Sequence, residues 1–467
     1  MSKYLSIFML IRMEVIFFMD IFGKVKNVNK EQWHTKFKLL KENPYGEGER
    51  EILKQWVDGM IDRDHKMVKE FQTTFHSSFW EFYLYACFKE LGFILDQSHN
   101  RPDFMIKEPY ELNVEAVVAN IKKDGRAESD RNLEDLNSIF IPPKNQNDFF
   151  EVQNEAIVRH ANAISSKVKK YEDGYSKCEW VKQDVPFVIA MSSYSQVNYG
   201  REFIYPMMTL LYGMYYIPEK DNYISVKYIQ KPGTESNIPV GIFNSDKYSE
   251  ISAVLYSCTT TIGKLTSLSK SAGYYSLNEV YNLRQDYQDT RIPYKLQHVE
   301  TNLPETLTDG LFLFHNPYAK NKLDIKCFEQ SNVIQFFFEN GELRYISNTC
   351  PIVCRINFPK ILEKEYLMLI SEYIRQYNDF SPIEFYSLEP CKKISINFDK
   401  ECLVCVWVIM SDNKEIRNLH YLREQFFTDG DLKEEAIQKI KQREEAIEKI
   451  IRIDLIREKK IFDLINQ

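Results

Sequence analysis

The pattern of apolar and polar positions along the chain predicts helices and strands in alternation. Residues 63–91 contain neither Pro nor Gly and are followed by Gly92, which predicts one long helix. Short apolar runs separated by turn residues then predict three strands within residues 92–119. A second helix is predicted over residues 148–171, and a buried strand over the apolar run at 185–193. This order predicts an α/β (α+β) fold, in which helices flank a mixed β-sheet.

The pattern changes along the chain and predicts four regions. An Asn-Gly pair at 340–341, between apolar runs, predicts a hairpin in a smaller α+β domain. The tail begins with a capping-box pair, Asp431 and Glu434, and predicts a charged amphipathic helix. This helix could pack on the protein itself, or join a second copy or a partner protein. The expected regions are an N-terminal helical region (1–60), the main α/β domain (61–325), the α+β domain (326–430) and the terminal helix (431–467).

Composition and charge narrow the class of protein only slightly. The net charge of −7 argues against a protein that coats nucleic acid indiscriminately, although a local basic cleft is compatible with it. Nine cysteines without the spacing of a disulfide framework fit a reducing compartment, so a cytoplasmic location is expected. Arg12 and Glu14 interrupt the apolar start of the chain, and no membrane association is expected.

Acidic residues interrupt the apolar segment RPDFMIKEPYELNVEAVVAN, residues 101–120. A hairpin folded about Pro109 pairs residues whose numbers sum to 218, so Phe104 faces Val114 on an apolar side. The same register places Asp103 opposite Glu115 on the polar side. Opposed residues have Cβ atoms ~4.5–5.5 Å apart, where carboxylates repel each other unless a cation lies between them. The register therefore predicts a site for a divalent cation.

A third acid, Glu81, lies in the nearly all-apolar run FWEFYLYACF. A helix that is apolar all round is buried, so this carboxylate is expected either to be neutral or to lie against a cation. The simpler interpretation places Glu81 at a wet edge of the helix.

An acid on a helix, Pro-Asp at the start of a hairpin strand and an acid on the next strand resemble the PD-(D/E)xK superfamily of restriction-endonuclease-like nucleases. The resemblance extends to uncharacterised bacterial proteins that read similarly to FWEFYLYACFKELGF, RPDF, NVEAVVA and PFVIAM in this order, within residues 63–192. It implies a restriction-endonuclease-like core and a nuclease that hydrolyses DNA phosphodiester bonds, in restriction or defence against foreign DNA. It also implies Mg²⁺, for which Mn²⁺ substitutes, held by Asp103 and Glu115 with Glu81 as an auxiliary ligand.

The chain departs from the superfamily at the catalytic lysine. That lysine follows the second acid by two positions, where this chain has Val117. Lys167 and Tyr171 on the second predicted helix form a K-x-x-x-Y arrangement, similar to the Q-x-x-x-Y element of exonuclease branches. We expect Lys167 to replace the missing lysine. The alternatives are a surface lysine and a catalytically inactive nuclease fold that serves as a nucleic-acid-binding or assembly subunit.

The helix that carries Lys167 also begins a locally basic stretch. Residues 159–182 contain six Lys or Arg and three Asp or Glu. Such an excess could contact a phosphate backbone, with Arg159 at the phosphate beside the metal; a solvated helix face is the simpler explanation. The expected nucleic-acid contacts, to DNA rather than RNA, are Arg159, Lys169, Lys170 and Tyr171.

Overall fold

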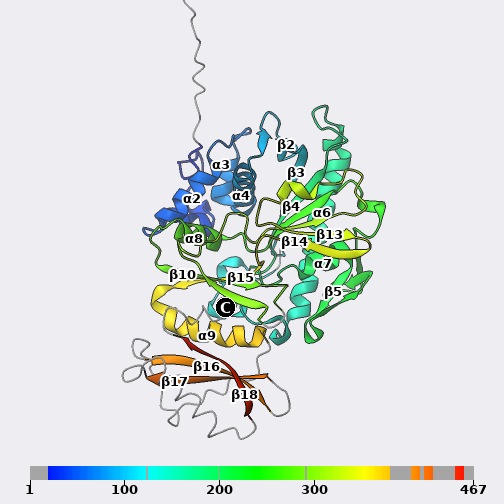
Figure 1. The fold of residues 1–467 in the computed structure, drawn as a ribbon. Helices are drawn as coiled ribbons and strands as arrows, with labels where there is room; N and C mark the ends of the chain where they lie inside the picture. The colour runs from blue at the N-terminus through cyan, green and yellow to red at the C-terminus, as the bar shows by residue number, and fades with distance from the viewer. Residues whose placement is uncertain are drawn as a thin grey trace, which may run out of the picture.

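The computed structural model describes residues 19–122, 125–197, 199–289, 292–378, 401–410, 415–423 and 447–456. The protein is mixed α/β, with helices flanking a large mixed sheet, as the sequence predicts (Figure 1). Within these ranges no helix has the length and apolar character needed to cross a membrane.

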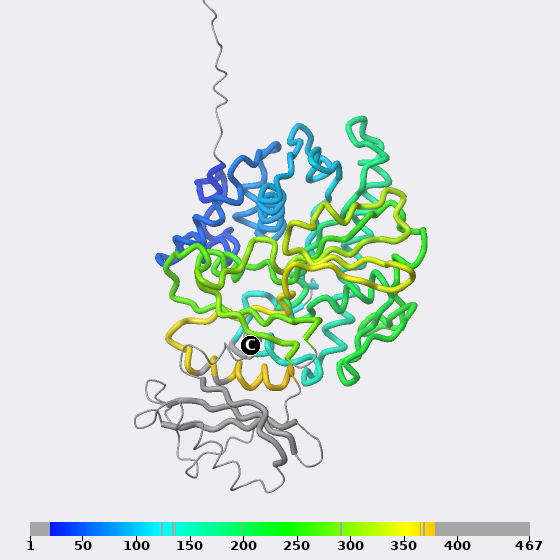
Figure 2. The backbone as a smooth tube through the Cα atoms, in the orientation of Figure 1, coloured from blue at the N-terminus to red at the C-terminus, as the bar shows by residue number. Residues whose placement is uncertain are grey.

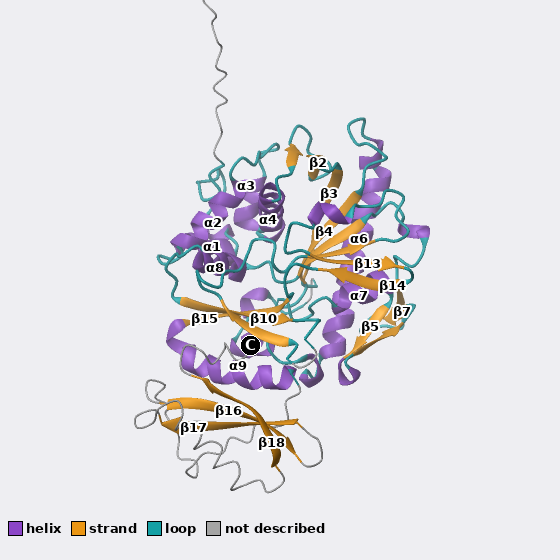
Figure 3. Cartoon of the chain, viewed as in Figure 1, coloured by secondary structure: helices purple, strands orange, loops and turns teal. Residues whose placement is uncertain are grey.

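The largest sheet has eight strands. In spatial order they are β1 (Ile94–Asp96), β2 (Phe104–Glu108), β3 (Leu112–Asn120), β4 (Phe187–Tyr194), β9 (Ala253–Ser257), β12 (Phe312–His315), β13 (Ile334–Glu339) and β14 (Glu342–Ile346). The first three strands are antiparallel neighbours, whereas β3, β4 and β9 run parallel. β12 is antiparallel to β9 and parallel to β13, and β14 returns antiparallel. The neighbouring strands β2, β3 and β4 are labelled among the orange strands of Figure 3.

Two helices cover opposite faces of the central strands. Alternate residues of a strand face opposite sides, and in β4 Val188 and Ala190 join the apolar cluster of α4 (His76–Glu90). Ile189 and its alternates join the cluster of α6 (Phe149–Asp173) on the other side. The buried indole of Trp80 donates a 2.9 Å hydrogen bond to the carbonyl oxygen of Ala190, which fastens α4 to the sheet.

The predicted hairpin register is confirmed. Phe104 pairs with Val114, Met105 with Asn113 and Ile106 with Leu112, so paired numbers sum to 218. The turn also contains an ion pair between Lys107 and Glu111, with 3.6 Å between Nζ and Oε1. The alternation of apolar and polar residues therefore predicted the register of these two strands correctly for every pair.

The long helix predicted for residues 63–91 is wrong, because it is two helices. α3 (Met67–Thr73) ends before Phe75, which has a φ of +63°. The Phe75 ring is buried and stacks on both Phe71 and Phe79, with centroids 5.2 and 5.1 Å away. We infer that aromatic packing holds this unfavourable backbone conformation, which no local helix propensity indicates. The predicted stop at Gly92 is present, with a φ of +74°.

The boundary expected after residue 325 does not separate two domains. The hairpin predicted from Asn340-Gly341 is present, but its strands β13 and β14 extend the main sheet. β15 (Ile352–Pro359) pairs with β10 (Asn278–Gln285), which in turn pairs with β11 (Tyr294–His298). Strand pairing therefore joins residues up to 359 to the main domain, and α9 (Glu363–Tyr377) packs on β11 and β15.

The N-terminal region is helical over its described part, as predicted. It contains α1 (Thr35–Glu42) and α2 (Glu47–Val57), and its apolar side joins the cluster of α4. Figure 2 shows these first helices beside α8 (Ile262–Ser271), with which α2 makes contacts. The remaining elements are α5 (Leu133–Ser138), α7 (Tyr205–Tyr212), β5 (Met214–Ile217), β6 (Asn222–Ser225), β7 (Tyr228–Gln230) and β8 (Asn237–Pro239).

The terminal helix expected over residues 431–467 is wrong where the structure describes that range. Residues Ile447–Ile456 form strand β18, which pairs with β16 (Glu401–Met410), as does β17 (Glu415–Arg423). Ile451, Ile453 and Leu455 alternate with Arg452 and Asp454, a period of two that favours a strand. The rest of 431–467 lies outside the described residues.

Candidate active site

Asp103 and Glu115 meet at the open end of the β2–β3 hairpin. The Asp103 backbone N–H lies 3.3 Å from Glu115 Oε2, and Asp103 Oδ2 accepts a 2.8 Å hydrogen bond from the backbone of Ala116. Glu115 is 1% exposed, whereas Asp103 is partly open. The structure thus brings together the two carboxylates that the hairpin register placed opposite each other.

Lys167 reaches this pair from α6, on the face of the sheet to which Glu115 points. Its Nζ atom lies 2.6 Å from Glu115 Oε1 and 3.8 Å from Asp103 Oδ2. The Lys167 side chain is 15% exposed, so it is not a surface lysine. The expected placement of Lys167 is therefore present in the structure, and its catalytic role remains a prediction.

Val117, which stands at the position of the superfamily's lysine, faces the apolar cluster of α6. Its side chain is partly buried and packs against the apolar cluster of α6, and Val117 pairs with Met191 of β4. A lysine at this position would bring its charge into that cluster. Lys167, six residues before the end of α6, places its ammonium group beside the carboxylates.

Burial and neighbouring charges shift the pKa values of Asp103 and Lys167. Burial, with the Glu115 charge second, raises the pKa of Asp103 to about 7, although Lys167 acts in the opposite direction. Burial alone would lower the pKa of Lys167, but the charges of Asp103 and Glu115 raise it overall. The ammonium group is thus charged at neutral pH and partly compensates the two acids.

Glu81 approaches the pair from α4 and contributes a third carboxylate. Burial, with the Asp103 charge next, raises the pKa of Glu81 to about 8. Glu81 and Asp103 line one small pocket together with Arg63, whose guanidinium donates to the Asp103 carbonyl oxygen at 3.3 Å. A neutral Glu81 was one of the alternatives that the sequence allowed, and its raised pKa supports it.

Tyr175 and Arg63 belong to the site but were missed from the sequence. The Tyr175 hydroxyl interacts with Glu115, and burial, followed by the Glu115 charge, raises its pKa to about 12. Tyr175 lies just beyond the end of α6, where it begins a short 3-10 helix after Gly174. Because the helix ends before Tyr175, helical spacing from Lys167 does not indicate it. Arg63 precedes α3, and no sequence pattern links it to the hairpin.

The residues expected to bind nucleic acid divide into two groups. Lys169 and Lys170 are exposed near the end of α6 and remain available for a phosphate backbone. Tyr171 is 2% exposed and stacks on Phe187 at 4.1 Å, so the expected contact between Tyr171 and nucleic acid is corrected: its ring belongs to the core.

Arg159 does not lie beside the carboxylates. It precedes Lys167 by eight residues on α6, which corresponds to roughly 12 Å along the helix axis. Its guanidinium lies 3.7 Å from Glu155 on the same helix. The expected position of Arg159 at the phosphate beside the metal is therefore corrected, and any contact of Arg159 with nucleic acid stays a prediction.

The ligand atoms at the hairpin suit a hard divalent cation. Asp103, Glu115 and Glu81 offer carboxylate oxygens, which Mg²⁺ and Mn²⁺ prefer, and no His or Cys is part of the group. Burial first, and the charge of a neighbouring carboxylate second, raise the pKa values of Asp103 and Glu81. The ligand atoms therefore fit the expected metal in type, and its binding by these three residues together stays a prediction.

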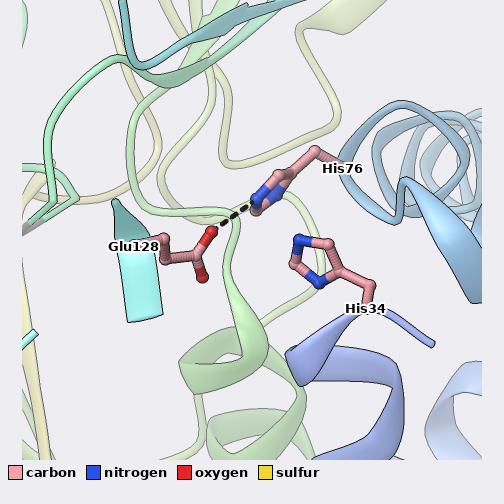
Figure 4. A group of neighbouring side chains, drawn as sticks. All are labelled: His34, His76 and Glu128. Carbon is pink, nitrogen blue, oxygen red and sulfur yellow. Dashed lines mark hydrogen bonds and ion pairs between the residues drawn. The ribbon is translucent and has the colours of Figure 1, made fainter. Parts of the chain in front are cut away.

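A second group, His34, His76 and Glu128, was not predicted (Figure 4). One ligand atom from each residue lies within 4.8 Å of the others, so the group could hold a metal ion. His34 caps α1, His76 begins α4, and Glu128 lies in a short 3-10 helix after β3. Because three distant segments supply these residues, no spacing in the sequence indicates the group.

The hydrogen bonds around Glu128 favour a charge cluster over a metal site. Glu128 Oε2 lies 2.9 Å from His76 Nε2, and Oε1 lies 2.8 Å from Lys36 Nζ. His34 Nδ1 accepts the backbone N–H of Lys36 at 3.3 Å, which leaves the ring proton on Nε2. A metal on His34 would need that proton to move, and Lys36 already supplies the positive charge.

Comparison with known proteins found no matching family model, no matching curated protein and no matching solved structure. The functional interpretation therefore depends on the residues of the site itself.

Proposed function

We propose that this protein is a Mg²⁺-dependent nuclease that hydrolyses DNA phosphodiester bonds at the Asp103–Glu115 pair, in restriction or defence against foreign DNA. The observation that carries the proposal is the position of Lys167. Its ammonium nitrogen lies within 3.8 Å of both carboxylates, although it comes from a different element than the superfamily's lysine. A lysine, two opposed acids and a third acid in one partly open site match the chemistry of phosphodiester hydrolysis.

Each side chain has a distinct role in the proposal. Asp103 and Glu115 hold the metal ion, and Glu81 joins them once it loses its proton. Bound Mg²⁺ supplies a polarised phosphate and a water molecule of lowered pKa. Lys167 releases its contact with Glu115 and stabilises the negative charge that develops on the attacking oxygen. Tyr175 keeps Glu115 oriented through its hydroxyl group.

The order of elements supports a restriction-endonuclease-like core. α4, which carries Glu81, precedes the antiparallel strands β1, β2 and β3, and α6 connects β3 to the parallel strand β4. The three acids thus occur on the helix, the hairpin start and the next strand, which is the arrangement that carries the sequence resemblance.

The test is cleavage of plasmid and single-stranded DNA in Mg²⁺ by the wild-type protein and by Glu115→Gln. We expect metal-dependent cleavage by the wild type and a rate at least ~100-fold lower in the variant, because a neutral amide is a poor Mg²⁺ ligand. Glu111→Gln at the hairpin turn is the matched control and should cleave at the wild-type rate. Equal cleavage by wild type and Glu115→Gln would refute the proposal.

The alternative is a catalytically inactive nuclease fold that binds nucleic acid or serves in an assembly. Val117, at the superfamily's lysine position, favours it. It predicts that the wild type binds DNA without cutting it in either Mg²⁺ or Mn²⁺. Both proposals place the protein in the cytoplasm. In both, residues 431–467 could bind a second copy or a partner protein.

A further inference from the structure

An exposed aromatic surface adjoins the carboxylates, and we call its residues His99, Arg101, Tyr175 and Trp180 the aromatic ledge. The Trp180 side chain is 39% exposed, which is high for an indole. Its ring stacks on the imidazole of His99, with 4.3 Å between centroids and 3° between planes. The stacked pair forms a flat surface that belongs to neither of the two apolar clusters.

Contacts connect this surface to the candidate active site. Trp180 Nε1 donates a 2.8 Å hydrogen bond to the carbonyl oxygen of Arg101, two residues before Asp103. The Arg101 guanidinium lies 5.9 Å from the centroid of the Tyr175 ring. Tyr175 in turn interacts with Glu115. A continuous row of contacts therefore leads from the carboxylates to the exposed indole.

Charge along the ledge suits a phosphate beside the aromatic surface. Arg101 is exposed, and among the residues that the structure describes no carboxylate forms an ion pair with it. Arg101 and Asp103 are two residues apart, which is at most ~7 Å along the chain. The Arg101 guanidinium can therefore contact the phosphate that adjoins a phosphate bound at Asp103. Lys169 and Lys170 add positive charge where α6 ends before Tyr175.

We infer that the aromatic ledge binds an unpaired base of single-stranded DNA, stacked on the exposed indole of Trp180, while Arg101 contacts the adjoining phosphate. This rests on the proposed function and names its substrate class. A base within a duplex is stacked on its neighbours and cannot offer a face to the ledge, whereas an unpaired base can. The ledge therefore selects single strands over duplex DNA.

Binding without metal tests the ledge separately from cleavage. Fluorescence anisotropy in EDTA compares a labelled 20-nucleotide single strand with its duplex and with RNA of the same sequence. We expect the wild type to bind the DNA strand at least ~10-fold more tightly than the duplex. Trp180→Ala should weaken binding of the strand ~5–100-fold, because stacking of a base on one aromatic residue contributes that much affinity. Duplex affinity should change less than about twofold.

Two further variants keep the test decisive. Trp180→Phe preserves a stacking face and should retain most of the strand affinity, which also controls for misfolding of Trp180→Ala. Tyr275→Ala removes an exposed aromatic ring elsewhere, 71% exposed, and should change nothing. Unchanged strand binding by Trp180→Ala, equal loss for strand and duplex, or preference for RNA would overturn the inference. If the ledge variants behave as expected but the wild type cuts no DNA, the proposed nuclease function is refuted, whereas the inference that the ledge binds single-stranded DNA is supported.

Discussion

At the scale of single residues, Lys167 determines how the two opposed carboxylates coexist. The Glu115 side chain is 2% exposed and its Oε1 lies 2.6 Å from Lys167 Nζ. Without that ammonium group, Asp103 and Glu115 would repel each other with no positive charge between them. Lys167 thus serves the metal-free protein as a counter-ion and, in the proposed reaction, as the group that stabilises developing charge.

Lys167→Met separates these roles from metal binding. We expect the rate of DNA cleavage in saturating Mg²⁺ to fall ~10²–10⁴-fold, since a positioned charged group contributes about this much. Mn²⁺ binding should persist, because the variant removes a positive charge that competes for Glu115. Lys220→Met, at an exposed position in the 3-10 helix after β5, is the control and should cleave at the wild-type rate. Wild-type cleavage by Lys167→Met would show that the lysine has no catalytic role.

Individual residues also show where sequence reasoning reaches its limit. The opposed pair Asp103 and Glu115 followed from strand alternation, which is strictly periodic. Lys167 followed from the missing lysine at Val117 together with helical spacing. The prediction for Tyr171 was wrong because spacing on a helix gives the face but not the depth of burial. The tyrosine that reaches the site is Tyr175, which lies beyond the end of the helix.

At the scale of elements, α4 sets the position of Glu81 relative to the hairpin. The helix is held by the Trp80 indole, which is fully buried and bonded to the Ala190 carbonyl oxygen of β4. Its N-terminal limit is set by Phe75, whose packing splits the helix that the sequence predicts as one. Such breaks come from contacts between distant residues, so local propensity does not reveal them.

Trp80→Phe is expected to lower the free energy of unfolding by about 1–3 kcal/mol. The change leaves a cavity in the α4 cluster and removes the hydrogen bond to Ala190. Chemical denaturation monitored by far-UV circular dichroism measures it. The same substitution at exposed Trp180 should change stability by less than about 0.5 kcal/mol, as is usual at the surface. Equal effects at both positions would contradict the anchoring of α4 by Trp80.

At the scale of the whole molecule, one eight-stranded sheet connects segments that the sequence assigned to separate domains. The α/β class, the helix-strand order of the first half and the hairpin at Asn340-Gly341 all followed from periodicity. The joining of β13 to β12 did not, because the pairing of parallel strands leaves no local signal. The site lies at the first strands of this sheet, where helices from opposite faces meet the same hairpin.

Calorimetric titration with Mn²⁺ shows whether Asp103, Glu115 and Glu81 form a divalent-cation site. Below their raised pKa values of about 7 and about 8, Asp103 and Glu81 hold protons, and the metal must displace them. The affinity of the wild type should therefore rise between about pH 6 and about pH 8.5, with proton release on binding. Asp103→Asn and Glu115→Gln should each bind at least ~10-fold more weakly, whereas the control Glu111→Gln should match the wild type. Binding that is equal in all four proteins, or no binding to the wild type at about pH 8.5, would contradict the account.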